Sequence, residues 1–210
     1  MHYCYRIMNF IWFGEMVSTK YQENILRCAN LNPDYQVQLW TEIITEELKS
    51  NLSNVHLIDL NKEISEFQTY EWLLNETNKG YKSDILRYEI IYKSGGVYFD
   101  TDTICVEPLN DLLTASFVAF SPIPRSHLSN GVLGFPKGSK FLKYVLDALK
   151  LNIKKNPKGT SKTGPPFLTG CFKKYNDSNI NMIFSLVKKT SKNVVYQTLD
   201  ASWMVKKIVP

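Results

Sequence analysis

The first sixty residues alternate between apolar, strand-like segments and segments with helical periodicity. Residues 5–13 form an apolar and aromatic run that ends at Gly14, residues 35–40 alternate apolar and polar side chains, and residues 55–60 form a short strand. Helical spacing follows Ser18, a candidate N-cap, and a second, polar helix lies between the last two strands. This order is typical of a parallel, nucleotide-binding type of sheet. The sequence therefore predicts an α/β fold with a mostly parallel central sheet flanked by helices.

The rest of the chain continues with elements of both kinds. The predicted helices are 61–80, 81–93 with Ser83 as its cap, a short one after Pro108, 141–151 and 166–175; the predicted strands are 97–99, 115–121, 132–135, 181–184 and 194–197. A segment rich in Lys, Gly and Pro, 154–166, is predicted to be a flexible loop. With 210 residues and no internal repeat, the chain is predicted to be a single domain over 1–210 that ends in a C-terminal segment, 196–210.

The net charge of +5 hides an uneven distribution of charge. Residues 150–210 hold 12 Lys and only two acidic residues, whereas residues 1–149 carry a net charge of −5. A basic segment suits an anionic partner such as nucleic acid, a membrane surface or a phosphorylated small molecule, or it is a solvated face rich in Lys. No nucleic-acid reader motif accompanies it, so we expect no nucleic-acid partner; peripheral membrane contact through this Lys-rich part stays open.

The cysteines and the N-terminus bear on the compartment. Cys4, Cys28, Cys105 and Cys171 are scattered, with no metal-binding spacing, and we expect buried free thiols rather than disulfides. The chain shows neither a signal-peptide pattern nor an apolar run of transmembrane length. These features predict a cytoplasmic protein.

One segment, residues 83–102 (S-D-I-L-R-Y-E-I-I-Y-K-S-G-G-V-Y-F-D-T-D), concentrates the residues that carry chemistry. Asp84 and Arg87 are three apart on the predicted helix and share one face. A Gly-Gly pair then allows a sharp turn into a strand that ends in Asp100 and Asp102, at the edge where open α/β sheets bind ligands. If the chain stays extended there, both carboxylates face one cleft.

Two carboxylates so close repel each other, and a divalent cation removes that repulsion. Ligands that are all oxygen suit Mg²⁺ or Mn²⁺ better than Zn²⁺, and substrate phosphates commonly complete the coordination of such ions. The pattern therefore predicts a metal-bridged diphosphate. An EF-hand is excluded because its Gly and closing Glu are missing. A phosphotransferase of the haloacid-dehalogenase type stays open as an alternative, although Ile104 stands where it should have Thr or Val.

The same segment resembles the signature of the glycosyltransferases with a DXD-containing sugar-binding region (glycosyltransferase family 32-like), to which the large clostridial glucosylating toxins are distantly similar. Other stretches resemble this family in the same order along the chain: Ile11–Gly14, Asn32–Tyr35, Leu39–Thr41, Asn130–Gly134, Thr163–Thr169 and Ser202-Trp203. The resemblance implies a GT-A fold, a nucleotide-sugar donor, Mn²⁺ or Mg²⁺, and a retaining hexosyltransferase that acts on a hydroxyl of a glycan or protein.

The resemblance also implies roles for individual residues. The metal ligands would be Asp102, Asp100 and Asp200. The donor would contact Trp12, Asp84, Arg87, Tyr98, Asp100, Ser202 and Trp203, and Asn130 would approach the donor sugar or the acceptor hydroxyl. Of these, the catalytic set would be Asp84, Arg87, Asp100, Asp102 and Asn130. Structural roles remain as alternatives: a core Trp at position 12, an Asp84–Arg87 ion pair, and Trp203 as an anchor of the terminus.

Two further expectations concern the mechanism of the reaction and the identity of the donor sugar. No carboxylate stands out as a covalent nucleophile, which favours a front-face reaction in which the leaving phosphate helps to deprotonate the acceptor. Small residues, Ser129 and Gly131, flank Asn130 and would leave room for an N-acetyl group, so both hexose and N-acetylhexosamine donors are expected. UDP-sugars are favoured and GDP-sugars stay open, and a sugar-nucleotide-binding protein without turnover is the alternative function.

Overall fold

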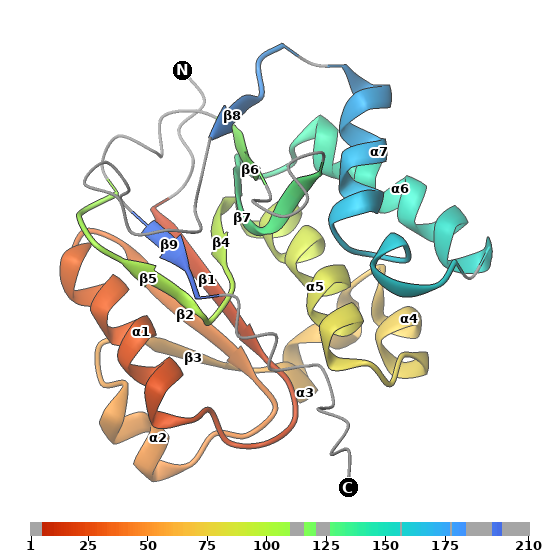
Figure 1. Ribbon diagram of the computed structural model, residues 1–210. Coiled ribbons are helices and arrows are strands. Elements are labelled where there is room, and N and C mark those ends of the chain that lie inside the picture. Colours follow the sequence, from red (N-terminus) through yellow and green to blue (C-terminus); the bar gives the residue numbers. More distant parts are fainter. Residues whose placement is uncertain are drawn as a thin grey trace, which may run out of the picture.

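A mixed sheet runs through the centre of the computed structural model, which describes residues 6–109, 116–120, 127–155, 157–176, 178–183 and 195–198. The strands are β1 (Ile7–Trp12), β2 (Gln36–Thr41), β3 (His56–Asp59), β4 (Gly96–Phe99), β5 (Thr103–Cys105), β6 (Phe117–Phe120), β7 (Leu128–Phe135), β8 (Asn181–Ile183) and β9 (Val195–Gln197). Seven of them form one sheet in the order β3-β2-β1-β4-β7-β6-β8, while β5 and β9 pair separately (Figure 1). The first four strands of that order are parallel, and β7 is antiparallel to both its neighbours.

Helices cover both faces of this sheet (Figure 1). They are α1 (Thr19–Leu31), α2 (Glu46–Asn51), α3 (Leu60–Glu63), α4 (Tyr70–Asn75), α5 (Lys79–Ser94), α6 (Lys140–Lys155) and α7 (Pro165–Tyr175), with two 3-10 turns, η1 (Ile64–Glu66) and η3 (Gly159–Ser161). Within the described part of the chain, none of the helices combines the length and apolar character needed to cross a bilayer.

The alternation of side chains along the strands divides the core into two layers. Met8 and Phe10 of β1 are buried against α1 and α2, whereas Ile11 of the same strand and Tyr98 of β4 belong to the layer under α5, α6 and α7. Because successive side chains point to opposite faces of a strand, a sheet that is buried on both faces needs apolar residues at odd and at even positions. That requirement explains the nearly continuous apolar runs seen in the sequence.

The junction between α5 and β4 depends on two glycines. Gly95 and Gly96 have φ values of 74° and 97°, which favour glycine over residues with a side chain. A Cβ on Gly96 would also lie 2.4 Å from the backbone oxygen of Ile7, so β4 can lie beside β1 only without one. The predicted sharp turn from helix to strand is therefore confirmed.

Most predicted elements are present, with local differences. The helix that carries Asp84 begins at Lys79 and is capped by Asn78, whose side chain accepts a hydrogen bond from the Tyr81 N–H at 3.0 Å, so the prediction of Ser83 as the cap is wrong. The helix predicted over 61–80 is divided into α3, η1 and α4. Within the predicted loop 154–166, α6 extends to Lys155 and η3 forms a short turn. The helix expected after Pro108 lies mostly outside the described residues.

The expectation of four free thiols is wrong. Cys28 of α1 and Cys105 of β5 form a disulfide, which spacing alone could not reveal because 77 positions separate them. Cys171 is a buried free thiol, and burial raises its pKa to about 11. Cys4 lies outside the described residues.

Candidate functional site

The centre of the site is the guanidinium of Arg87, which points from α5 toward the end of β4. Its side chain is only 5% exposed, and its nitrogens lie 3.2 Å from an Asp84 oxygen and 3.1 Å from an Asp100 oxygen. Arg87 also donates a hydrogen bond of 2.7 Å to the backbone oxygen of Asn130 on β7, and its guanidinium lies 4.3 Å from the ring centroid of Tyr98. In this way Arg87 connects the helix, the end of β4 and β7.

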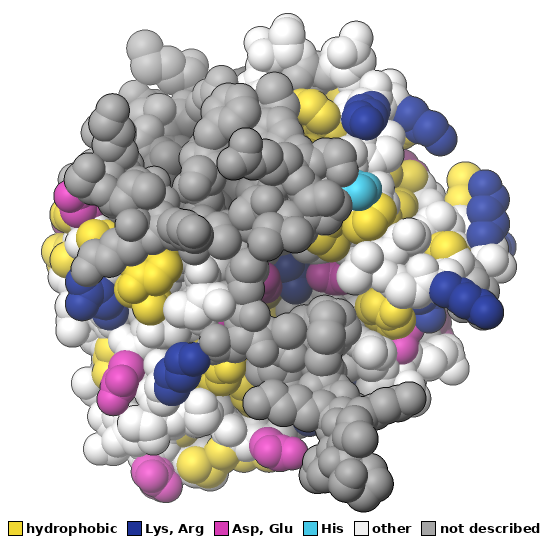
Figure 2. Space-filling view, viewed as in Figure 1, with side chains coloured by type: hydrophobic (Ala, Val, Ile, Leu, Met, Phe, Trp, Pro, Cys, Tyr) yellow, Lys and Arg dark blue, Asp and Glu magenta, His cyan; other side chains and the backbone are white. Residues whose placement is uncertain are grey.

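Electrostatics keeps Arg87 charged despite its burial. Burial alone would lower the pKa of the guanidinium, but the neighbouring Asp100, Tyr98 and Asp84 outweigh this effect and raise that pKa above its usual value. Figure 2 shows acidic and basic side chains together in a recess near the middle of this face. The carboxylates of Asp84 and Asp100 balance this positive charge within the protein.

Asp84 is held from two directions by later parts of the chain. One of its oxygens accepts a 2.7 Å hydrogen bond from the Asn130 side-chain amide, and the other accepts one of 2.8 Å from the Thr163 hydroxyl. Burial raises the pKa of this carboxyl, against the opposing effects of Arg87 and both hydrogen bonds. Asp84 and Asn130, expected to act together on a sugar, are thus brought into direct contact.

Both carboxylate oxygens of Asp100 contact protein side chains. A relay of donors runs from Arg87 to the Ser83 hydroxyl at 2.9 Å, from Ser83 to the Tyr98 hydroxyl at 3.2 Å, and from Tyr98 to Asp100 Oδ1 at 2.7 Å. The other oxygen of Asp100 accepts a hydrogen bond of 3.1 Å from the side-chain amide of Gln197. Burial raises the pKa of Tyr98 well above its usual value, so its hydroxyl remains a donor. We call Ser83, Asp84, Arg87, Tyr98, Asp100 and Asn130 the α5 network.

The two carboxylates of the D-T-D sequence lie on a tight turn rather than on extended chain. The Thr103 N–H donates a 2.9 Å hydrogen bond to the Asp100 carbonyl, so the expectation that residues 100 and 102 share one side of a strand is wrong. Within the described residues, no three His, Cys, Asp or Glu side chains gather as a metal site. The donor set nevertheless fits a hard cation, because Asp102 can contribute carboxylate oxygen directly while Asp100, held by the protein, can act through water.

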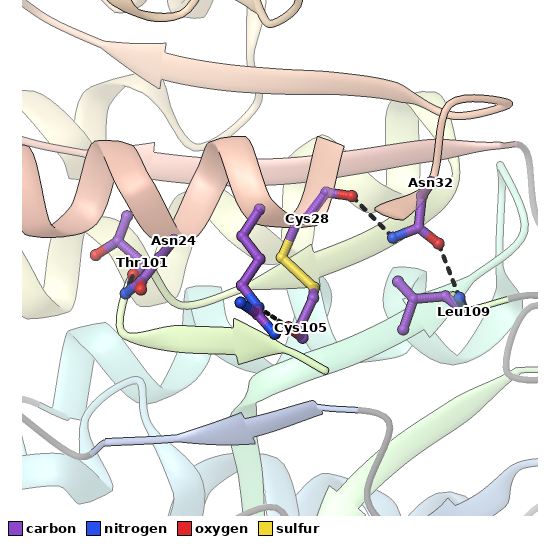
Figure 3. Close-up of a disulfide and its surroundings, with 7 residues drawn as sticks. Asn24, Cys28, Asn32, Thr101, Cys105 and Leu109 are labelled. Carbon is purple, nitrogen blue, oxygen red and sulfur yellow. Dashed lines mark hydrogen bonds between the residues drawn. A yellow bond between two sulfur atoms is a disulfide. The ribbon is translucent and has the colours of Figure 1, made fainter. Parts of the chain in front are cut away.

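On its other side, this turn is attached to α1 (Figure 3). Asn24 and Cys28 on α1 and Asn32, the C-cap of α1, are spaced four residues apart, and so are their partners on the segment after β4. Asn24 donates to the Thr101 carbonyl at 2.9 Å, Cys28 is bonded to Cys105, and Asn32 accepts from the Leu109 N–H at 2.8 Å. Arg27 Nε adds a 2.6 Å hydrogen bond to the Cys105 carbonyl. We call these residues the α1 clamp; it holds the chain that runs from Thr101 to Leu109.

Trp12 lies at the carboxyl end of β1, where a nucleobase was expected. Its indole N–H donates to the Glu15 carbonyl at 2.7 Å, and its ring lies 5.0 Å from that of Tyr21 in a tilted arrangement. The side chain is half-buried, so the stacking role stays a prediction. Asp200, Ser202 and Trp203 lie outside the described residues, and the roles expected for them stay predictions too.

Sequence reasoning missed three polar residues of the site. Gln197 lies outside every motif, Tyr88 lies within residues 83–102 but has no role predicted for its hydroxyl, and Ser83 is predicted only as a helix cap. The only available signal was polarity at positions that are otherwise apolar, as at Gln197 after Val195 and Tyr196.

The space beside Gly131 is filled by protein. A Cβ at this position would lie 2.3 Å from Gln197 Nε2 and 2.4 Å from Asp100 Oδ2. Ser129 Oγ, on the other side of Asn130, accepts a 3.1 Å hydrogen bond from the Gly131 N–H. Ser129 and Gly131 therefore serve internal contacts and leave no space for an N-acetyl group beside Gly131.

The sequence of this site matches a known family. Residues 18–118 match the family described as the glycosyltransferase sugar-binding region containing a DXD motif. These residues include α1, the turn with Asp100 and Asp102, and most of the α5 network. That part of the chain is a DXD-containing glycosyltransferase sugar-binding region, as the resemblance predicted.

Two of the relatives are fungal enzymes. The chain is 29% identical over 141 residues to inositol phosphoceramide mannosyltransferase 3 of Schizosaccharomyces pombe, which covers 67% of this chain and 36% of the relative. It is 32% identical over 184 residues to the mannosyl phosphorylinositol ceramide synthase SUR1 of Saccharomyces cerevisiae, covering 81% and 42% respectively. The chain thus spans well under half the length of these two relatives.

Solved structures agree on the fold. The PaToxG glycosyltransferase superposes with a TM-score of 0.72 at 22% identity, over 83% of this chain and 70% of that one. The UDP-bound glycosyltransferase domain of the YGT toxin gives a TM-score of 0.64 at 10% identity, over 87% and 80%. The fold is therefore the GT-A fold of these glycosyltransferase domains, as expected.

Proposed function

We propose that this chain is a metal-dependent, retaining glycosyltransferase that moves a sugar from a nucleoside diphosphate to a hydroxyl of a glycan or protein. The observation that carries the proposal is the α5 network, in which Arg87 joins Asp84 to Asp100 directly beside Asp102. The match of residues 18–118 to the glycosyltransferase family and the fungal mannosyltransferase relatives support it. UDP-sugars are favoured, with GDP-sugars as the other candidate, because one fold relative is a UDP-bound domain.

The candidate metal and nucleotide ligands have separate tasks in this proposal. Asp102 would hold Mn²⁺ or Mg²⁺ directly and Asp100 through water, with Asp200 as a further candidate ligand. When bound, the metal supplies positive charge next to the leaving diphosphate. Trp12 would stack on the nucleobase, and Ser202 and Trp203 would contact the diphosphate.

The donor sugar would lie between α5 and β7. Asp84 and Asn130, which are hydrogen-bonded to each other, would orient sugar hydroxyls, while Arg87 places a permanent positive charge nearby. Positive charge fixed in advance stabilises the phosphate as the C1–O bond lengthens. The leaving phosphate oxygen would then accept the proton of the acceptor hydroxyl on the same face of the sugar. Hexoses are favoured over N-acetylhexosamines because the space beside Gly131 is occupied.

The disulfide bears on the compartment in which this reaction occurs. Disulfides persist in oxidising compartments and are rare in the cytosol. The Cys28–Cys105 bond therefore favours an oxidising compartment over the cytoplasm. The cytoplasmic location expected from the sequence stays a prediction. Membrane contact through the Lys-rich part also stays a proposal; one of its lysines, Lys162, is already engaged in an ion pair with Glu76 at 2.6 Å.

A donor-hydrolysis assay tests the proposal. The protein is incubated with UDP- and GDP-sugars, with Mn²⁺ or with a chelator, and release of the nucleoside diphosphate is measured. We expect metal-dependent release that Asp102→Asn abolishes, and NMR of the transferred sugar should give the anomer of the donor. Binding of a nucleotide sugar without any release would support the alternative, a binding protein without turnover. An inverted anomer or a trapped glycosyl-enzyme would contradict the front-face reaction.

A further inference from the structure

Gln197 has no role in the proposed reaction, yet it lies at the site. It is the last residue of β9 and is only 4% exposed, and its side-chain amide donates to Asp100 Oδ2 at 3.1 Å. The other oxygen of that carboxylate accepts from Tyr98 and lies 3.1 Å from Arg87. Both oxygens of Asp100 are therefore fixed, one by the α5 network and one by β9.

The backbone of β9 contacts the same turn. Gln197 is paired with Thr103, and the Thr198 N–H donates to the Asp102 carbonyl at 3.1 Å. One short segment thus contacts the side chain of Asp100 and the backbone of Asp102. A neutral amide suits this place, because a carboxylate would repel Asp100 and a lysine would repel a cation bound there.

Gly131 makes this contact sterically feasible. A Cβ at this position would overlap both partners of the hydrogen bond, at 2.3 Å from Gln197 Nε2 and 2.4 Å from Asp100 Oδ2. Asp100 and Gly131 are also joined through the backbone, since the Asp100 N–H donates to the Gly131 carbonyl at 2.8 Å. Gly131 therefore leaves the space in which Gln197 reaches Asp100.

We propose that Gln197 is a positioning residue that fixes the plane of the Asp100 carboxylate and thereby sets the affinity of the turn for a metal–nucleotide complex. This inference rests on the proposed function, because it assumes that Asp100 and Asp102 hold a divalent cation. Gln197 itself need not touch the donor. It restricts the rotation of the Asp100 carboxylate before the metal–nucleotide complex binds, so less conformational entropy is lost on binding.

Binding of Mn²⁺ in the presence of UDP provides the test. Free Mn²⁺ is followed by electron paramagnetic resonance for the wild type, Gln197→Ala and a matched control, Tyr196→Ala. The melting temperature of each metal-free protein is measured beside it. Tyr196 is the neighbour on the same strand and lines a separate pocket with Arg27 and Ile104. We expect about tenfold weaker binding for Gln197→Ala, since hydrogen bonds to charged groups are worth this much. Tyr196→Ala should bind Mn²⁺ and UDP as the wild type does.

Gly131→Ala approaches the same atoms from the opposite side. The overlapping atoms are the ends of two side chains, which can move without unfolding the strand, so we expect weakened binding at a nearly unchanged melting temperature. In combination with Gln197→Ala, the loss should be less than the product of the single effects, because both substitutions disturb one contact.

The outcomes separate this inference from the proposed function. If the wild type binds Mn²⁺ with UDP and Gln197→Ala binds equally well, the positioning role is overturned and the function stands. A loss of binding in Gln197→Ala that is matched by Tyr196→Ala, or that follows the melting temperature, also overturns it. If the wild type binds Mn²⁺ neither with UDP nor with GDP, and Asp102→Asn behaves identically, the proposed function itself fails, and the inference with it.

Discussion

The turn that carries Asp100 and Asp102 is held from two sides by different kinds of interaction. On one side, the α5 network uses buried charges, with Arg87 between Asp84 and Asp100. On the other, the α1 clamp uses a covalent bond and hydrogen bonds from side chains to the backbone. The two regions differ in what they do in addition to holding the turn. The α5 network faces the site and places charged groups in it, whereas the α1 clamp only attaches the turn to α1.

The two regions should therefore respond differently to the loss of one member. Removing one partner of a buried charge cluster leaves the others uncompensated in a medium of low polarity. Removing one member of the clamp leaves neutral groups that water or neighbouring bonds can partly satisfy. Catalysis should depend on the charges of the α5 network, and on the α1 clamp only because the clamp fixes the position of the turn.

Arg87→Met should give the largest effect. We expect a loss of about 3–5 kcal/mol in the free energy of unfolding, because Asp84 and Asp100 then remain buried without their cation. Donor hydrolysis should fall by about a thousandfold as the charge beside the phosphate is lost. Urea denaturation and the hydrolysis assay check both numbers. The matched control is Arg27→Met, which removes an exposed arginine of the α1 clamp; an equally large effect there would contradict the proposed difference between the regions.

Loss of the disulfide should rank second. The bond closes a loop between positions 77 apart, and its removal in Cys28→Ser with Cys105→Ser should cost about 3–4 kcal/mol of stability. At temperatures where the variant stays folded, we expect Mn²⁺ to be needed at higher concentration while the maximal rate is nearly kept. Peptide mapping without reduction should find the two cysteines linked. Wild-type metal dependence in the double variant would show that the clamp does not position the turn.

Asn24→Ala should have a smaller effect, of about 1 kcal/mol, because a single neutral hydrogen bond to the Thr101 carbonyl is lost. Thermal denaturation measures it, and Asn54→Ala, which removes an exposed side-chain contact with Asn30, is the control. In the background without the disulfide, the cost of Asn24→Ala should rise, since fewer bonds then hold α1 to the turn. Strict additivity would indicate that the members of the clamp act independently.

The smallest effect concerns pH. Burial opposes ionisation of Glu76, but its contact with Lys162 outweighs this and lowers the pKa of the carboxyl below its usual value near 4.5. A carboxyl with a lowered pKa in the folded state contributes stability above its unfolded pKa and loses it as pH falls through the folded pKa. Glu76→Gln should therefore reduce stability by less than about 1 kcal/mol at pH 7 and flatten its decline below pH 4.5. An unchanged slope in denaturation between pH 5 and 3 would contradict this.

The parts of the site that could be predicted from the sequence are those that are close along the chain. Asp84 and Arg87 lie three positions apart on α5, where helical periodicity places them together, and Asp100 follows after one glycine turn and one short strand. Gln197 and the Cys28–Cys105 pair could not be predicted, because β9 and β5 pair by tertiary packing over long separations. Ser83 was misjudged because its hydroxyl serves Arg87 and Tyr98 rather than the helix end. The turn at residues 100–103 was missed because alternation says nothing about where a strand stops.

The long separations have a consequence for how the protein reaches its native state. Asp84 and Asp100 are oriented by Asn130, Thr163 and Gln197, which follow their partners by 46, 79 and 97 positions. Contacts between distant positions form late in folding, since the entropy of closing the loop is lost before the contact is gained. The pairing of Arg87 with Asp84 is local and can form as soon as α5 does. During refolding, helical content should therefore recover first and the ability to bind Mn²⁺ with UDP last, so that the active arrangement is the final product of folding.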